Sequence, residues 1–324
     1  MEAVFELPTR IRTIDRRLTR SEISARIRRI DSVLSDLHER LDPCTLCPRS
    51  CAAHRLNGET GECGLGSELR LASVACHSGE EPPVSGPTGA INVFFSGCNL
   101  HCIHCQNWPI SQNRVGRILS QEEIAARILK KWRRGAHSLG WVTPTPQIVA
   151  ALEAYRLCLL QGFDLPLVHN GGGYENPEVI RLLSGIVDIW LPDAKTADPQ
   201  RGLMISGVVD YPERNRRTIA AMLEQVEDGT SRALIVRHLI LPGALADSKR
   251  VISLLWGSFQ SRIHLSLMAQ YFPTYRALDH ETLGRRVSSE EYESIVLYAE
   301  KLGFRNGWIQ KYEVENGIPL HCLP

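Results

Sequence analysis

The chain has 324 residues, of which 43% are hydrophobic and 23% are charged, so it can bury a large core and is expected to form about two domains or one α/β barrel with an appendage. Its formal charge of +1 gives no net field that would attract nucleic acid or a membrane surface. No run of about twenty apolar residues is present, and the first residues, MEAVFELPTR, lack the apolar core of a signal peptide. We therefore expect a cytoplasmic protein with no nucleic-acid partner and no membrane partner.

Residues 1–42 are predicted to form a helical N-terminal extension. Within 10–41, apolar residues such as Ile23 and Ile27 recur at helical spacing. Arginines are dense in this stretch, but acidic residues such as Glu22 are interleaved with them. The pattern predicts a solvated amphipathic helix pair rather than an arm that binds nucleic acid.

A Cys-rich metal-binding segment is predicted at 43–88. The chain has ten cysteines and no sign of secretion, so metal or redox chemistry is expected rather than disulfides. Four cysteines of this segment have the number and close spacing of a closed metal site: Cys44, Cys47, Cys51 and Cys63. Four thiolates suit zinc or a [4Fe–4S] cluster, and the glycines among them permit tight turns. Zinc and a second [4Fe–4S] cluster both stay open, with the neighbouring cysteine loop favouring iron–sulfur.

From residue 89 onward, short apolar runs alternate with helical patterns. Strands are predicted at 91–95, 139–143, 166–170, 187–193, 233–241 and 263–271. Helices are predicted at 121–134, 147–161, 177–184, 213–227, 247–258 and 289–302. This alternation indicates βαβ units and a parallel sheet. We predict an α/β fold, a partial (β/α)6 TIM-like barrel over 89–312 with a C-terminal tail at 313–324; a doubly wound sheet is the alternative that the pattern permits.

Polar residues or glycines stand at the end of nearly every predicted strand. In parallel α/β architectures, ligands bind at the C-terminal edge of the strands. The ligand-competent residues at these positions are Cys98, Thr143, Asn170, Asp193, Lys195 and Arg237. Three glycines follow Asn170 and would let a ligand approach the backbone closely. We therefore predict a ligand site at this edge of the sheet.

The stretch 96-SGCNLHCIHCQN-107 follows the first of these strands and carries three cysteines: Cys98, Cys102 and Cys105. A helix would place them on one face, but the run follows a strand pattern directly and is interrupted by residues typical of turns, so we predict a loop. Three thiolates on one loop can hold three irons of a cubane cluster. A zinc knuckle, with His101 or His104 as the fourth ligand, is the alternative.

The spacing Cys-x3-Cys-x2-Cys after the first strand of a (β/α) barrel resembles the radical S-adenosylmethionine (SAM) superfamily. Further motifs resemble one branch, the iron–sulfur proteins similar to pyruvate formate-lyase-activating enzymes: 44-CTLCPRSC-51, 98-CNLHCIHCQN-107, 142-VTPTP-146, 190-WLPDAK-195, 237-RHLILPG-243 and 267-LMAQYFP-273. The resemblance extends from about residue 43 to about residue 312. It implies a [4Fe–4S] cluster on three cysteines, SAM on the fourth iron, and a 5′-deoxyadenosyl radical that takes hydrogen from a substrate.

The resemblance also implies roles for individual residues. Cys98, Cys102 and Cys105 would be the cluster ligands, and five residues would lie near SAM: Thr143, Asn170, Asp193, Lys195 and Arg237. The chain departs from the family pattern at His104, where Phe or Tyr is usual, and at 141-WVTP-144, which replaces a Gly-Gly-Glu that receives the SAM amino group. Structural interpretations stay open: Asp193 and Lys195 can form a salt bridge, and Arg237 can satisfy a buried carboxylate.

These residues predict a radical SAM enzyme that acts on the glycine of a protein partner, as an activating enzyme does, or on a small molecule. By the same resemblance, its electron donor is a flavodoxin or a ferredoxin. A non-catalytic iron–sulfur electron carrier or a zinc-stapled interaction protein is the alternative from another class. The extension at 1–42 bears on the choice of substrate, because it could cover or extend the face that admits a peptide loop.

Overall fold

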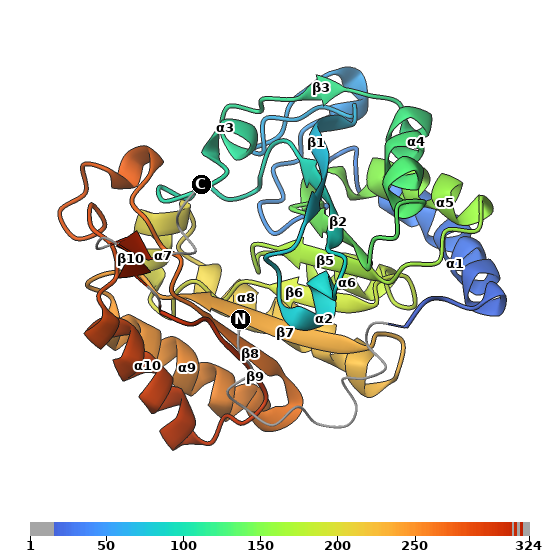
Figure 1. The fold of residues 1–324 in the computed structure, drawn as a ribbon. Coiled ribbons are helices and arrows are strands. Elements are labelled where there is room, and N and C mark those ends of the chain that lie inside the picture. The colour runs from blue at the N-terminus through green and yellow to red at the C-terminus, as the bar shows by residue number, and fades with distance from the viewer. Residues whose placement is uncertain (1–15, 313, 316–317, 320–324) are drawn as a thin grey trace.

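The computed structural model describes residues 16–312, 314–315 and 318–319. Its main feature is a nine-stranded sheet with the order β3-β1-β2-β4-β5-β6-β7-β8-β9 (Figure 1). The strands are β1 (Arg70–His77), β2 (Ala90–Phe95), β3 (Arg117–Ile118), β4 (Ser138–Val142), β5 (Leu167–Gly171), β6 (Ile189–Pro192), β7 (Ala233–Leu239), β8 (His264–Met268) and β9 (Gly307–Ile309). A separate sheet pairs β10 (Val314–Glu315) with β11 (Ile318–Pro319).

The strand order decides between the two predicted architectures. From β2 to β9, neighbouring strands are parallel and follow one another in chain order. A doubly wound sheet reverses its order at a switch point, and this sheet does not, so that alternative is excluded. β3 and β9 lie at opposite edges, so the sheet is not closed. The predicted partial (β/α)6 barrel is confirmed, with β9 as an additional strand that the sequence analysis missed.

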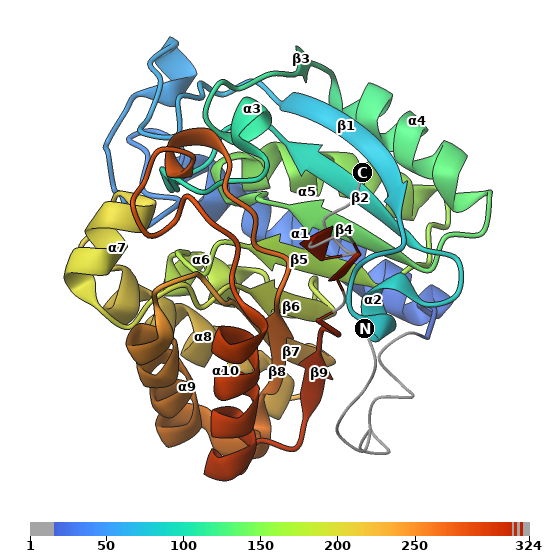
Figure 2. The same cartoon turned by 60° about the vertical axis from the view of Figure 1, so that its left-hand side comes forward.

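Helices follow the parallel strands and pack along the outside of the sheet (Figures 1 and 2). They are α4 (Gln121–Trp132), α5 (Ile148–Leu160), α6 (Pro177–Leu182), α7 (Pro199–Ser206), α8 (Tyr211–Glu227), α9 (Leu245–Phe259) and α10 (Ser289–Leu302). A capping box begins α4, because Ser120 Oγ accepts a hydrogen bond from Glu123 N at 3.2 Å and Glu123 Oε2 accepts one from Ser120 N at 2.8 Å. In the described part of the chain, no helix is both long and apolar enough to span a membrane.

The N-terminal extension contributes one described helix, α1 (Arg20–Glu39), which packs on α5 at the outside of the barrel. The predicted pair over 10–41 is therefore a single helix in the described residues; 10–15 lie outside them. Arg26 departs from the predicted solvated face. It is 6% exposed, and its guanidinium binds the Asp188 carboxylate at 2.7 Å. This buried ion pair joins α1 to the start of β6.

The segment 43–88 contributes a strand between β3 and β2 and a plug to the barrel, neither of which its composition indicated. β1 pairs antiparallel with β2 (Figure 2). The short helix α2 (Pro82–Ser85) lies inside the barrel near the N-terminal ends of the strands, where Val84 belongs to a buried cluster with Val168 and Ile235. The division of the chain at residues 42, 88 and 312 stays a prediction.

Candidate functional site

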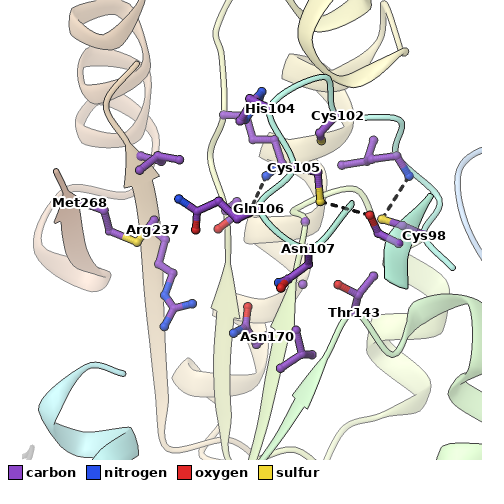
Figure 3. Close-up of a pocket in the computed structure, with 18 of the residues that line it drawn as sticks. Cys98, Cys102, His104, Cys105, Gln106, Asn107, Thr143, Asn170, Arg237 and Met268 are labelled. Carbon is purple, nitrogen blue, oxygen red and sulfur yellow. Dashed lines mark hydrogen bonds and ion pairs between the residues drawn. The ribbon is translucent and has the colours of Figure 1, made fainter. Parts of the chain in front are cut away.

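A cavity lies at the C-terminal ends of the parallel strands, at the opposite end of the barrel from α2 (Figure 3). All the side chains predicted near the cluster and SAM line it: Cys98, Cys102, Cys105, Thr143, Asn170, Asp193, Lys195 and Arg237. They follow or end β2, β4, β5, β6 and β7, so the parallel sheet gathers residues that are far apart in the chain. Their roles as ligands stay predictions.

The three-cysteine segment is a loop, since residues 96–107 contain only turns, bends and irregular backbone. The interpretation as one face of a helix is therefore excluded. Neighbouring backbone holds the loop on both sides: Ile103 N donates to Ile205 O at the end of α7, and Ile103 O accepts from Ala277 N, both at 3.0 Å. The loop thus has a defined backbone position between α7 and the segment after β8.

Each of the three thiols is hydrogen-bonded. The contacts are Leu100 N to Cys98 Sγ at 3.4 Å, Cys102 Sγ to Ser206 Oγ at 3.6 Å, and Cys105 Sγ with Ser111 Oγ at 3.1 Å. Three sulfurs on one loop beside a cavity fit a [4Fe–4S] cluster with three protein ligands. No three Cys, His, Asp or Glu side chains in the described residues have preformed metal-binding geometry.

Neither histidine of the loop acts as a fourth partner of the thiols. His104 is 7% exposed, its Nδ1 has no partner among the described residues, and its ring points away from Cys98 (Figure 3). Burial lowers the pKa of His104 to about 3, so the ring is neutral. His101 Nδ1 lies 3.2 Å from Gln112 Oε1, and its Nε2 lies 3.8 Å from Glu62. The arrangement therefore does not support a zinc knuckle.

Asp193 and Lys195 form the salt bridge that the sequence left open. Lys195 Nζ lies 2.6 Å from Asp193 Oδ2 at the end of β6. Burial is the largest single influence and disfavours the ammonium, but the Asp193 carboxylate, together with Cys102 and Tyr211, raises the pKa of Lys195 well above its ordinary value. Tyr211 anchors this turn, because its hydroxyl donates to Asp193 O at 3.0 Å and accepts from Lys195 N at 3.1 Å. The pair is a rigid, charged part of the cavity wall.

Arg237 also has carboxylate partners. Its Nε donates to Glu81 Oε1 at 2.8 Å, and its Nη2 bonds to both Glu80 and Glu81. Glu81 is fully buried, and Asn92 Nδ2 donates to Glu80 at 2.8 Å. Arg237 therefore satisfies the buried carboxylates of the loop between β1 and β2. Among the described residues, its Nη1 makes no hydrogen bond, and the side chain still borders the cavity.

Glu175 is a buried group at the site that the sequence analysis missed. It is 2% exposed, Thr145 Oγ1 donates to its Oε1 at 3.4 Å, and its Oε2 has no partner among the described residues. A Cβ at Gly171 would lie 2.5 Å from Oε1, so a side chain there would displace the Glu175 carboxyl. Burial, together with the Asp193 carboxylate, raises the pKa of Glu175 to about 8. A carboxylate two residues after a triple glycine was the available signal.

We expect Glu175→Gln to change how stability depends on pH. Between the ordinary pKa of 4.5 and the folded value of about 8, the folded carboxyl keeps a proton that the unfolded chain has lost. The free energy of unfolding therefore falls as pH rises through this range, by about 3 kcal/mol between pH 4.5 and pH 7. The variant has no carboxyl group at this position, so this loss is absent. Its free energy of unfolding, relative to that of the wild type, should therefore increase as pH rises.

Urea unfolding at pH 5, 6, 7 and 8 measures this effect. The control is Glu178→Gln, which removes the charge of a carboxylate whose side chain is 64% exposed and should not change the pH slope. Parallel stability curves for the wild type and Glu175→Gln across this range would contradict the prediction.

The four cysteines at 44–63 form a second concentration of thiols. A Cβ at Gly61 would lie 2.9 Å from Cys51 Sγ and 3.7 Å from Cys63 Sγ, so glycine is needed there. Burial, with the other cysteines close by, raises the pKa of Cys47 to about 12. The Arg55 guanidinium is 2% exposed, and its Nη1 lies 3.7 Å from Cys44 Sγ. The number and type of donors fit zinc or an iron–sulfur cluster equally.

The four-cysteine segment packs directly on the three-cysteine loop. Gly97 has φ +78°, and a Cβ there would lie 2.7 Å from Leu65 and 3.0 Å from Cys63 O. Arg49 Nε donates to Asn99 O at 2.8 Å. The two cysteine groups, separate in the sequence, therefore share one packed region.

Comparisons with known proteins agree with this site. Residues 92–247 match the family model described as the radical SAM superfamily. Over 176 residues, the chain is 30% identical to a pyruvate formate-lyase-activating enzyme of Clostridium pasteurianum, covering 52% of this chain and 68% of that protein. Over 267 residues, it is 29% identical to an uncharacterized protein of Methanocaldococcus jannaschii, MJ0674, covering 80% of this chain and 74% of that protein.

Solved structures are similar at a lower level. SuiB of Streptococcus suis bound to S-adenosylmethionine has a TM-score of 0.48 and 11% identity, covering 66% of this chain and 48% of that chain. A domain of a pyruvate-formate lyase-activating enzyme from Bacteroides vulgatus has a TM-score of 0.34 and 14% identity, covering 48% of this chain and 86% of that chain. The chain spans about half the length of SuiB.

Proposed function

Because the chain belongs to the radical SAM superfamily, we propose that Cys98, Cys102 and Cys105 hold a [4Fe–4S] cluster and that the cavity beside them binds SAM and a substrate from which hydrogen is taken. One observation carries the proposal: the three-cysteine loop and all five predicted SAM-proximal side chains line the same cavity. Such a cluster, when bound and reduced, would supply one electron to SAM and so the radical chemistry by which hydrogen is taken from a substrate.

The role of the chain is to orient the reactants and exclude water. Part of the cavity wall is apolar: Phe95, Leu100, Ile110, Val142, Leu239, Leu241 and Met268. Such a wall limits quenching of a radical by solvent. Thr143 has φ +57°, which is a strained conformation for a β-branched residue and costs about 1–3 kcal/mol. Strain of this kind is concentrated at functional sites, which supports a role for Thr143 in binding SAM.

The remaining polar side chains are proposed to orient SAM by charge and hydrogen bonding. Asn170 lines the cavity, and its side-chain amide offers both an N–H donor and a carbonyl acceptor. Lys195 and Arg237 supply positive charge for the SAM carboxylate, although both are already paired with protein carboxylates. We therefore propose that Arg237 contributes one hydrogen bond, from Nη1, rather than a bidentate clamp. Asp193 holds Lys195 in place.

We propose that the hydrogen comes from a glycine of a protein partner. The relative named as a pyruvate formate-lyase-activating enzyme supports this substrate class. The described part of the N-terminal extension also supports it, because α1 lies on α5 outside the barrel rather than across the cavity. A flavodoxin or ferredoxin as electron donor, and a cytoplasmic location, belong to the same proposal. A small-molecule substrate is the other outcome that the experiment below distinguishes.

Anaerobic reconstitution with iron and sulfide, followed by SAM and dithionite, tests the function. We expect 5′-deoxyadenosine, measured by liquid chromatography. A glycyl radical detected by electron paramagnetic resonance (EPR) on an added candidate partner protein would identify the substrate class, whereas deuterium transfer from a labelled small molecule would identify the other. Iron binding without any 5′-deoxyadenosine would refute the radical-enzyme proposal and favour an electron carrier.

We further propose that Cys44, Cys47, Cys51 and Cys63 bind a second metal, either zinc or a [4Fe–4S] cluster. Cys47→Ala is expected to lose that metal and to retain the SAM-binding cluster, because its ligands lie on a different loop. Metal analysis by mass spectrometry and EPR of the reduced protein measure the two sites separately. Loss of the SAM-binding cluster's EPR signal from Cys47→Ala, as from Cys102→Ala, would contradict two independent sites.

A further inference from the structure

Two serine hydroxyls, delivered from outside the three-cysteine loop, lie beside two of its thiols. Ser111 is the last residue of α3 (Trp108–Ser111), and its Oγ lies 3.1 Å from Cys105 Sγ. Ser206 is the last residue of α7, and its Oγ lies 3.6 Å from Cys102 Sγ. The third thiol, Cys98, receives a backbone N–H from Leu100, and its Sγ lies 3.8 Å from Asn99 Oδ1, an acceptor on the loop itself. Among the described residues, hydroxyl groups from outside the loop therefore reach two of the three cysteines.

The hydrogen bonds around Ser111 set the direction of its proton. Gln112 Nε2 donates to Ser111 Oγ at 3.2 Å, so that oxygen acts as an acceptor on one side. Gln112 Nε2 also donates to Leu100 O at 3.1 Å, which fixes the amide orientation. The hydroxyl proton of Ser111 is then available for the sulfur. A thiolate has no proton to give, so Ser111 becomes the donor once Cys105 loses its proton to ligate a metal.

Ser206 is held even more firmly. Its side chain is fully buried, and its backbone carbonyl accepts a hydrogen bond from His101 N at 3.0 Å. The polarity of its contact with Cys102 reverses on ligation for the same reason. This backbone hydrogen bond ties the end of α7 to the loop and keeps Ser206 next to Cys102.

We propose that Ser111 and Ser206 are positioning residues that donate hydrogen bonds to the thiolates of Cys105 and Cys102 and raise the reduction potential of the bound cluster. The inference rests on the proposed function. Reduction adds a negative charge to the cluster, and hydrogen bonds to its sulfurs stabilise the more negative state. Losing one such bond therefore makes the cluster harder to reduce.

An EPR redox titration of the reconstituted protein tests the proposal. Ser111→Ala and Ser206→Ala should each move the midpoint potential of the cluster to a more negative value, and Ser111→Thr, which keeps the hydroxyl, should restore it. A tenfold shift of the reduction equilibrium corresponds to about 59 mV for a one-electron couple. The control is Ser96→Ala, since Ser96 is buried beside the same loop but donates to Val115 O at 2.8 Å and to no sulfur.

Each result of the redox titration either supports or overturns the inference. An unchanged potential in both alanine variants, in protein that carries the cluster, would overturn the inference and leave the proposed function standing. If Ser111→Ala loses the cluster while Ser111→Thr and Ser96→Ala keep it, the hydroxyl holds the ligand and the inference stands. Loss of the cluster from Ser111→Thr as well would show a packing role and overturn it. A wild type that never forms a cluster would refute the proposed function and this inference together.

Discussion

Replacing Cys102 with alanine is expected to abolish formation of 5′-deoxyadenosine. The two thiols left on the loop, Cys98 and Cys105, are too few to hold three irons of a cubane, so the cluster is lost or unstable. Cys102 is 8% exposed and faces Ser206, so alanine removes the sulfur with little change to the surface. The expected result is a signal at the level of the protein-free control in the liquid-chromatography assay.

Cys76→Ala is the matched control. Cys76 is exposed on β1 and lies outside both cysteine groups, so this variant should form 5′-deoxyadenosine as the wild type does. Substantial activity in Cys102→Ala, or equal loss in Cys76→Ala, would contradict the assignment of the ligands.

Asp188→Ala is expected to cause the largest loss of stability among the substitutions considered. Its carboxylate binds two guanidinium groups, Arg26 at 2.7 Å and Arg232 at 2.9 Å, and accepts a hydrogen bond from Leu167 N at 2.8 Å. Removing this carboxylate leaves the buried guanidinium of Arg26 without its anionic partner. Breaking a buried ion pair in this way costs about 3–5 kcal/mol, which chemical denaturation measures as a lower midpoint.

The control is Asp31→Ala, at an ion pair between α1 and α5 on the surface. Asp31 pairs with Arg156, and their side chains are 46% and 33% exposed. Water screens such a pair, so the expected loss is below about 1 kcal/mol. Similar losses in the two variants would show that burial of Arg26 does not control the strength of its ion pair.

The repeating part of the fold was predictable because it is carried by local patterns. Six strands and most of the helices that follow them have the apolar periodicity and length of ordinary elements, and the predicted helix at 121–134 begins where α4 does. β9 is three residues long, too short for a periodic signal. β1 was missed because it lies in a segment rich in cysteine and glycine, and it becomes a strand by pairing with β2.

The candidate site was predictable to a similar extent. The loop at 96–107 and the polar strand ends were visible because parallel strands bring their C-terminal ends to one edge. The sequence did not show which residues form ion pairs with the charged side chains at these strand ends. Arg237 binds Glu80 and Glu81, which lie in a loop that no motif connected with β7. Glu175 was missed because only packing shows that a carboxylate is buried there.

The sequence alone therefore indicated the class of chemistry and the alternation of strands and helices, whereas the strand order of the folded chain decided for the partial barrel. The spacing of three cysteines and the alternation of strands and helices are both properties of contiguous segments. Only the tertiary structure decided how each side chain is used: Ser111 and Ser206 beside the thiols, Arg237 on two carboxylates, and the second cysteine group against the loop. The physical reason is that these hydrogen bonds and ion pairs form between segments that are far apart in the chain. Local sequence patterns do not show which of those segments come into contact.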